Sequence, residues 1–261
     1  MSRFEGRTVL VAGSTGMAAS AAHAIASEGG SVFVASRTDG HAQALAEGIP
    51  GSGWIAADLS REDEATAAVA ACVEQFGRLD ALYHVAGISG RRFGDGPLHE
   101  ASLAGWRTVM DANVTSLFLL ARATVRRMLE QEPDSDGLRG AILAMSSVLA
   151  RHPSPAHFGT HAYAASKGAI ESLVRATAAT YAPKGIRVNA IAPSLVATPM
   201  SERARTDTDI LAYLRARQPL AAGPIEVDAV TPVALHLLSA ESRMVTGQVV
   251  TVDGGWSVSE G

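Results

Sequence analysis

The segment from Thr8 to Ser27 constrains the fold most, because it is apolar and uncharged but interrupted by glycine. Its 20 positions approach the length of a membrane span. However, Gly13-Ser14-Thr15-Gly16 at its centre does not suit a lipid-facing helix, and Glu5 does not suit the basic start of a signal peptide. The pattern instead predicts a buried strand over Thr8–Ala12, a glycine turn, and an Ala-rich helix to about Glu28.

This glycine turn has the features of an anion-binding site. Glycines let the backbone approach a phosphate, and the free N–H groups and dipole of the following helix attract it. A second apolar run, Ser31–Ser36, completes a strand–helix–strand unit. The full G-x-G-x-x-G fingerprint is absent, so the turn alone is weak evidence for dinucleotide binding.

The rest of the chain repeats the alternation of strand and helix. Further strands are predicted at Trp54–Asp58, Ala81–Gly87, Ala141–Ser147, Arg187–Ala192 and Gln248–Val252. Further helices are predicted at Ala65–Phe76, Ser102–Glu132, Ala162–Ala182 and Glu226–Leu238. The expected fold is α/β: one Rossmann-type doubly wound parallel sheet of about seven strands, with helices on both faces. We expect a single domain over residues 1–261, with Thr198–Gly223 as a mobile insertion on the substrate side.

Composition excludes several classes of partner. The formal net charge is −4 and there is no long run of Lys or Arg, so nothing indicates nucleic-acid binding. No segment indicates a membrane protein. The only cysteine, Cys72, excludes an intramolecular disulfide and suggests a reducing compartment, so we expect a cytoplasmic protein.

Tyr163 and Lys167 form the clearest catalytic pattern. Four residues apart on a predicted helix, their side chains lie on one face, one turn apart. A nearby ammonium favours the phenolate, so we expect Lys167, together with a bound cationic cofactor, to lower the pKa of Tyr163 from about 10 towards neutrality. Ser147 ends the preceding predicted strand and supplies a hydroxyl.

With these residues in place, the chain resembles the short-chain dehydrogenase/reductase family over nearly its whole length. The matching segments are collinear: the glycine loop, Asp58-Leu59, Val85-Ala86-Gly87, Asn113, Ser147, Tyr163-x-x-x-Lys167, Arg187-Val188-Asn189, Pro193 to Thr198, and Val252-Asp253-Gly254-Gly255.

The resemblance implies four catalytic residues. Tyr163 would exchange the proton with the substrate oxygen, and Lys167 would lower its pKa and bond the nicotinamide ribose. Ser147 would orient and polarise the carbonyl, while Asn113 would hold a water in a proton relay. The residues implied in cofactor binding are Gly13, Ser14, Thr15, Gly16, Met17, Ser36, Arg37, Asp58, Leu59, Ala86, Gly87, Tyr163, Lys167, Pro193, Val196 and Thr198.

The end of the second predicted strand favours NADP(H) over the alternative, NAD(H). An NAD site places a carboxylate there for the ribose 2′-hydroxyl, whereas an NADP site needs a cation for the 2′-phosphate. Ser36 carries no charge, and Arg37 offers a fork of donors suited to phosphate oxygens. Asp39 is the counter-evidence, because it could reach a ribose.

The chain departs from the family pattern at several positions. The glycine loop is one residue short, with Ala18 or Ala19 in place of its last glycine, His84 replaces the usual Asn, and Ser194 replaces a Gly. The loop before Tyr163 carries three histidines: His152, His157 and His161. They have no helical spacing and no adjacent Cys or carboxylate, so we expect no metal and assign them to a wall of the substrate pocket.

The expected function is NAD(P)(H)-dependent interconversion of a ketone or aldehyde with an alcohol, of the 3-oxoacyl or small-ketone reductase type. One alternative is a dinucleotide-binding sensor without turnover, but all four catalytic side chains are present. Another is an enoyl reductase, in which Tyr and Lys tend to be further apart. Arg91 and Arg92 are either solvated or placed to meet an acidic or phosphopantetheine-linked substrate.

Two predicted helices indicate self-association. Val114–Met128 and Ala169–Tyr181 carry apolar residues around much of their circumference, more than one sheet contact needs. Because the family commonly pairs these helices between subunits, the resemblance implies a homotetramer, with a homodimer as the alternative.

Overall fold

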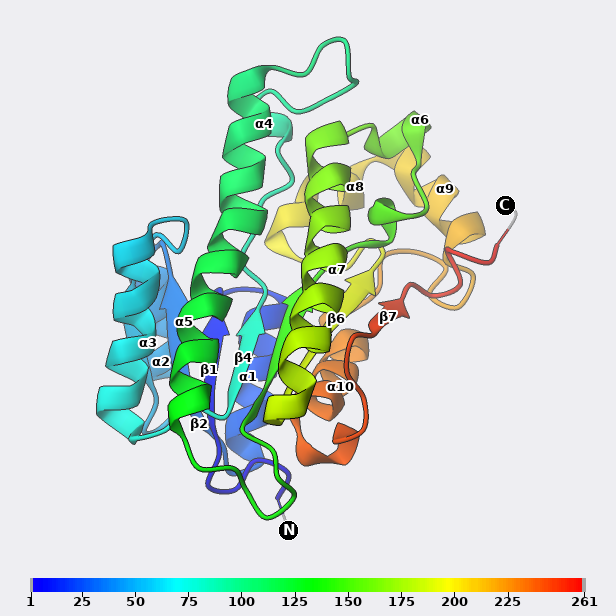
Figure 1. The fold of residues 1–261 in the computed structure, drawn as a ribbon. Coiled ribbons are helices and arrows are strands. Elements are labelled where there is room, and N and C mark those ends of the chain that lie inside the picture. Colours follow the sequence, from blue (N-terminus) through cyan, green and yellow to red (C-terminus); the bar gives the residue numbers. More distant parts are fainter. Residues whose placement is uncertain (1, 260–261) are drawn as a thin grey trace.

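A computed structural model describes residues 2–259 (Figure 1), and a seven-stranded sheet forms its centre. The strands run parallel in the order β3-β2-β1-β4-β5-β6-β7. They are β1 (Thr8–Ala12), β2 (Ser31–Ser36), β3 (Gly53–Ala56), β4 (Ala81–His84), β5 (Gly140–Met145), β6 (Ile186–Pro193) and β7 (Val249–Val252). The doubly wound parallel sheet expected from the sequence is therefore confirmed.

Helices cover both faces of this sheet. In chain order the helices are α1 (Met17–Ser27), α2 (Asp39–Glu47), α3 (Glu62–Phe76), α4 (Leu103–Met110), α5 (Ser116–Glu130), α6 (Pro155–Phe158), α7 (His161–Tyr181), α8 (Glu202–Thr206), α9 (Thr208–Arg217) and α10 (Val227–Leu238), of which α6, α8 and α9 lie outside the two cores of the sheet. Alternate residues of each strand belong to two separate cores, because successive side chains point to opposite faces of the sheet. Helices α1, α2 and α10 pack on one core, and α3, α5 and α7 pack on the other.

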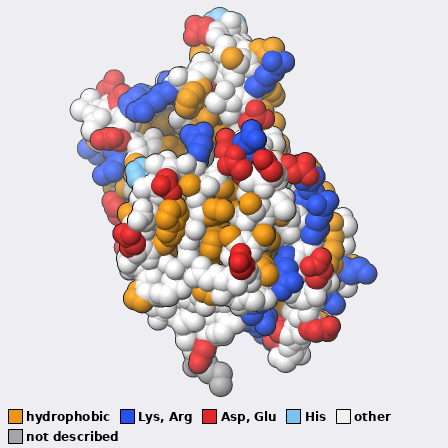
Figure 2. All heavy atoms as spheres, turned by 90° about the vertical axis from the view of Figure 1, so that its left-hand side faces the viewer, with side chains coloured by type: hydrophobic (Ala, Val, Ile, Leu, Met, Phe, Trp, Pro, Cys, Tyr) orange, Lys and Arg blue, Asp and Glu red, His pale blue; other side chains and the backbone are white. Residues whose placement is uncertain are grey.

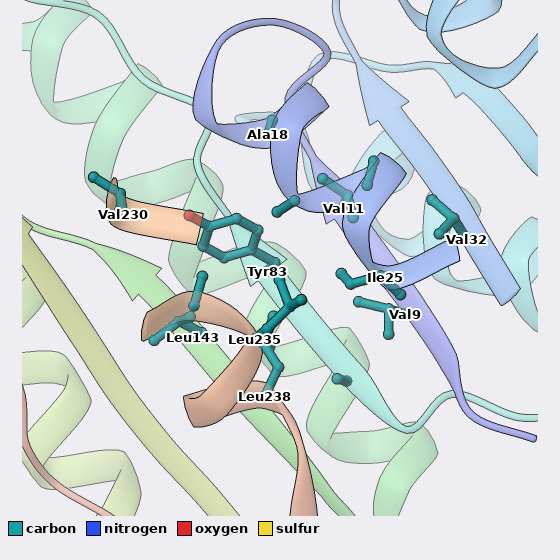
Figure 3. Packing of buried hydrophobic residues seen from close by; sticks show 14 of the residues in the cluster. Val9, Val11, Ala18, Ile25, Val32, Tyr83, Leu143, Val230, Leu235 and Leu238 are labelled. Carbon is teal, nitrogen blue, oxygen red and sulfur yellow. The ribbon is translucent and has the colours of Figure 1, made fainter. Parts of the chain in front are cut away.

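Tyr83 of β4 shows how the first core is packed. Its ring lies among Val11 of β1, Leu143 of β5 and Leu235 of α10 (Figure 3). The side chain is fully buried, and its hydroxyl has no hydrogen-bond partner among the described residues. The ring therefore stabilises the core by apolar packing alone.

The strand order changes direction between β1 and β4, and this fixes where a ligand can bind. Connections from β1 lead to β2 and β3 on one side, whereas β4 begins the other half of the sheet. In open parallel sheets, ligands bind in the crevice beyond the strand ends at such a switch point. The glycine turn after Ala12 and the loop after His84 lie side by side here, because Val85 and Ala86 both donate N–H to the Ala12 carbonyl.

Three elements differ from the sequence-based expectation. The helix predicted over Ser102–Glu132 is divided: one π-type turn, Asp111–Thr115, separates α4 from α5. Helix α2, which had not been predicted, follows β2. The predicted insertion Thr198–Gly223 contains α8 and α9, which bury Ala204, Ile210 and Leu214 in a third small core.

The uncharged segment Thr8–Ser27 forms β1, the turn and α1. Across residues 2–259, no helix has both the length and the apolar character needed to span a bilayer.

Candidate active site

Helix α7 brings Tyr163 and Lys167 together, as the spacing predicted. Its Ala-rich sequence favours an α-helix, and the two side chains lie one turn apart. The Lys167 ammonium lies over the Tyr163 ring, 5.4 Å from the ring centroid. Tyr163 is half-buried and Lys167 is only 4% exposed, so both act from within the protein rather than from its surface.

The end of β5 holds the Lys167 side chain in place. Its Nζ donates a hydrogen bond of 2.8 Å to the backbone carbonyl of Met145. Burial lowers the pKa of Lys167 to about 8, because a charged amine loses hydration there. The ammonium is therefore positioned but still mostly protonated at neutral pH.

The pKa of Tyr163 moves in the direction opposite to the sequence-based expectation. Burial raises this pKa above its ordinary value, and the neighbouring Ser147 hydroxyl opposes the change. Burial therefore outweighs the nearby Lys167 ammonium, which donates to Met145 and lies over the face of the ring. The protein's own groups therefore keep Tyr163 as a protonated acid.

Ser147 lies just beyond β5, beside Tyr163. Its hydroxyl accepts a hydrogen bond from the N–H of Leu149 and is largely buried. Ser146 anchors the same segment to α7 by donating to the Lys167 carbonyl and to the Glu171 carboxylate, both at 3.2 Å. The strand end and the helix are thereby held in register.

Asn113 occupies the π-type turn and is fully buried. Its amide donates to the Ile88 carbonyl and to the Ser166 hydroxyl, and its carbonyl accepts from Ile88 N–H. It therefore links the loop after β4 to α7. The side chain lines neither of the two cavities described below.

Asp95 is a site residue that the sequence did not reveal. It is buried, and its two carboxylate oxygens accept from the N–H groups of Ala162 and Tyr163, both at 2.9 Å. A carboxylate is favourable at a helix N-terminus, where N–H groups lack intrahelical partners. Asp95 thus fixes the first turn of α7, which carries Tyr163. No local sequence pattern predicts a contact between residues so far apart in the chain.

A cavity of about 480 Å³ lies beyond the switch point and suits an extended phosphate-linked ligand. Its lining includes most of the predicted cofactor residues: Gly13, Ser14, Thr15, Met17, Ser36, Arg37, Asp58, Leu59, Ala86, Gly87 and Thr198. Gly16 lies outside the lining, but it has a φ of 55° and a Cβ there would lie 2.9 Å from the Thr198 methyl. Glycine is therefore required at position 16 by both conformation and space.

The end of β2 carries the residues expected to contact the 2′ position of the cofactor's ribose. Ser14 donates to the Ser36 hydroxyl at 2.9 Å, and exposed Arg37 lines the same cavity. Asp39, the counter-evidence from the sequence, begins α2 and is not part of this lining. The hydroxyl of Ser60 lowers the pKa of Asp58, so this carboxylate is ionised.

A second cavity of about 180 Å³ adjoins the first, and the two share Met17, Gly87 and Thr198 in their walls. Ser147, Tyr163 and Lys167 all line it, as do the predicted residues Pro193 and Val196. Its walls are otherwise mainly apolar, with contributions from Met145, Val148, Leu149, Phe158, Leu195 and Trp256. Phe158 and Trp256, 5.9 Å apart between ring centroids, were not predicted from the sequence.

The three histidines do not form a wall of this cavity, contrary to the sequence-based expectation. His157 packs on the Tyr213 ring, with centroids 4.7 Å apart. His161 Nδ1 lies 2.9 Å from the Gly96 carbonyl. Among residues 2–259, His, Cys, Asp and Glu side chains form no group of three that could hold a metal.

Comparisons with known proteins agree with this geometry. A family model described as enoyl-(acyl-carrier-protein) reductase matches residues 11–257. The cis-4-hydroxycyclohexanecarboxylate dehydrogenase of Sinomonas cyclohexanicum is 33% identical over 97% of this chain and 98% of its own.

Two solved structures have the same fold. A short-chain type dehydrogenase/reductase from Mycobacterium ulcerans is 28% identical, with a TM-score of 0.89 over 99% of this chain and 92% of its own. A 3-ketoacyl-(acyl-carrier-protein) reductase from Brucella melitensis, complexed with NADH, is 27% identical. Its TM-score is 0.86 over 97% of this chain and 99% of its own. Site geometry, sequence and fold thus agree that the chain belongs to the short-chain dehydrogenase/reductase family.

Proposed function

We propose that the protein is a nicotinamide-dependent oxidoreductase that interconverts a ketone or aldehyde with an alcohol, of the 3-oxoacyl or small-ketone reductase type. One observation carries the proposal. Ser147, Tyr163 and Lys167 line an apolar cavity that adjoins the cavity formed by the glycine turn. A carbonyl in the smaller cavity would lie next to a nicotinamide held by Pro193, Val196 and Thr198.

Each side chain has a distinct role in this reaction. A nicotinamide bound in the larger cavity would supply or accept the hydride at the carbonyl carbon. Tyr163 gives its proton to the carbonyl oxygen during reduction, and its raised pKa keeps that proton available. The hydroxyl of Ser147 orients the oxygen, and the Lys167 ammonium favours the phenolate left behind. Asn113 keeps the loop after β4 against α7.

An enoyl reductase is the second candidate, because the matching family model carries that description. The two reactions differ in the bond reduced: C=O in one and C=C in the other. A paired assay separates them, with acetoacetyl and crotonyl thioesters of N-acetylcysteamine and a reduced cofactor followed by absorbance. We expect oxidation of the cofactor with the acetoacetyl compound. Turnover of the crotonyl compound alone would favour the enoyl reductase, and no turnover of any ketone would favour a binding protein.

We propose NADP(H) as the preferred cofactor, with NAD(H) as the alternative. Arg37 lines the cofactor cavity next to Ser36, and its charge suits a 2′-phosphate. In wild-type protein we expect kcat/KM to be higher with NADPH than with NADH. Arg37→Ala should lower kcat/KM for NADPH about tenfold or more and change the NADH value little, because one charge-assisted contact is lost.

Asp39→Asn is the matched control for Arg37→Ala. Asp39 lies two residues away but outside the cavity lining, so its neutral variant should keep the wild-type cofactor ratio. A wild type that prefers NADH, or an Arg37→Ala variant with an unchanged ratio, would show that Arg37 does not bind the phosphate.

We further propose a homotetramer, with a homodimer as the alternative. Large apolar side chains remain exposed along α4 and α5, including Trp106, Phe118 and Leu129. Figure 2 shows hydrophobic side chains gathered between charged ones on the face it presents. Burying such surface between copies would be favourable. Light scattering at micromolar concentration should give about four times the 27.0 kDa chain mass, and a monomer would refute this assembly.

We propose a cytoplasmic location, because the single cysteine of the sequence, Cys72, cannot form an intramolecular disulfide. Its thiol is fully buried among apolar residues, and burial raises its pKa to about 12. A protonated thiol of this kind is unreactive, so the residue fills space in the core rather than forming a disulfide.

A further inference from the structure

Two arginines from distant segments line the substrate cavity. Arg91 lies in the loop after β4 and Arg203 lies in α8, and both line the same cavity as Ser147 and Tyr163. Both side chains are exposed at its opening. The remaining walls of the cavity are mainly apolar. Lys167, Arg91 and Arg203 are the charged side chains in its lining.

The two guanidinium groups are close enough to affect one another. Loss of hydration lowers the pKa of Arg91 first, the positive charge of Arg203 lowers it further, and Asp95 opposes the change. Like charges held together raise the free energy unless an anion lies between them. An anion at this position would remove that repulsion.

Neither arginine is fully used by the protein. Arg91 donates one N–H to the His157 carbonyl at 2.8 Å, and that bond aims the side chain. Within residues 2–259, Arg203 has one ion pair, with Asp207 at 4.0 Å. The Asp95 carboxylate accepts from the N–H groups of α7, and among the described residues it makes no hydrogen bond or ion pair with Arg91. Each guanidinium has five donors, so most of them stay available to a ligand.

We propose that Arg91 and Arg203 bind a carboxylate carried by the substrate, so that the preferred substrates are hydroxy or oxo acids with an apolar body. The inference rests on the proposed function and adds the substrate class. The apolar walls contact the hydrocarbon part, the catalytic residues contact the carbonyl, and the two arginines contact the carboxylate. Arg92 has no such role, because it does not line the cavity.

A matched substrate pair tests the charge preference. In 4-oxocyclohexanecarboxylate and 4-oxocyclohexanecarboxamide the ketone and ring are the same, and only the charge differs. We expect wild-type kcat/KM to be at least about tenfold higher for the carboxylate, and the difference to shrink as salt concentration rises. Equal kcat/KM values for the two ketones would overturn the proposal.

Single variants assign the effect to the two residues. Arg91→Gln and Arg203→Gln should each lower the carboxylate-to-carboxamide ratio of kcat/KM about tenfold, through KM more than kcat. Arg91→Lys keeps the charge and should retain most of the ratio. Arg92→Gln, which removes the neighbouring charge outside the cavity, should leave the ratio unchanged. A ratio that falls equally in Arg92→Gln would mean general surface attraction and would overturn the site.

Phosphate is the other anion that two arginines could bind. Acetoacetyl-CoA carries phosphates, whereas the N-acetylcysteamine thioester of acetoacetate does not. If Arg91→Gln lowers the CoA-to-cysteamine ratio but not the carboxylate-to-carboxamide ratio, the site binds a carrier phosphate and the carboxylate proposal is wrong. We expect the reverse pattern.

A binding measurement separates this inference from the proposed function. Cyclohexanecarboxylate contains no ketone, so its affinity for the protein with NADP⁺ can be measured by calorimetry without turnover. We expect it to bind at least about tenfold more tightly than cyclohexanecarboxamide, and Arg91→Gln to remove the difference. If no ketone is reduced but this difference is present, only the proposed function fails. If ketones are reduced but the difference is absent, only the carboxylate site fails.

Discussion

Replacing Tyr163 by phenylalanine should lower kcat at least about 100-fold, the usual effect of losing a general acid or base. The ring would remain over Lys167 and beside Ser147, but the proton given to the carbonyl oxygen would be gone. Because the ring is kept, cofactor binding should change little. The measurements are kcat for ketone reduction and the dissociation constant of the cofactor from fluorescence quenching.

Tyr83→Phe is the matched control, because it makes the same chemical change in β4, outside both cavities. The Tyr83 hydroxyl is buried, has no hydrogen-bond partner among the described residues, and lies in the core shared by α1 and α10 (Figure 3). Removing it should leave kcat unchanged and keep or raise stability, since an unsatisfied polar group is lost. Near-normal turnover by Tyr163→Phe would disprove the role of Tyr163 in proton transfer.

Asp95→Ala should destabilise the protein by about 2–4 kcal/mol, the range expected when two charge-assisted hydrogen bonds in a buried site are lost. Both bonds go to the first turn of α7, at Ala162 and Tyr163. Their loss should also lower kcat, since the backbone of Tyr163 is one of the two groups released. Chemical denaturation and ketone turnover measure the two effects.

Asp207→Ala provides the comparison for Asp95→Ala. Asp207 caps α9 in the same way, accepting from the N–H groups of Asp209 and Ile210, but its side chain is 38% exposed. Because water replaces those bonds, the expected cost is only about 1 kcal/mol. Equal destabilisation by the two variants would show that Asp95 is no more than an ordinary helix cap.

Local features of the site were readable from the sequence because they depend on short-range geometry. The helical repeat alone places Tyr163 and Lys167 on one face. Short apolar runs separated by helices require a parallel sheet, and the strand ends of such a sheet must meet at one edge. The positions of Gly13, Ser36 and Ser147 at that edge followed from the strand boundaries.

Contacts between distant segments could not be predicted from the sequence, because only the folded chain brings those segments together. Asp95 reaches Ala162 across 67 positions, and the Lys167 ammonium reaches the Met145 carbonyl across 22. No periodicity links such pairs. The same limit explains why the three histidines were assigned to the cavity wall, which Phe158 and Trp256 provide instead.

The sequence by itself determined which residues could carry proton transfer and on which fold, since residue type, helical spacing and the alternation of strands and helices along the chain are local properties. Only the tertiary structure decided the direction of the Tyr163 pKa, because burial outweighs a neighbouring charge whose donors are directed elsewhere. It also decided that Arg91 and Arg203, from distant segments, line the same substrate cavity. The hydration of an ionisable side chain and the charges near it depend on how the surrounding residues pack, and the whole chain determines that packing.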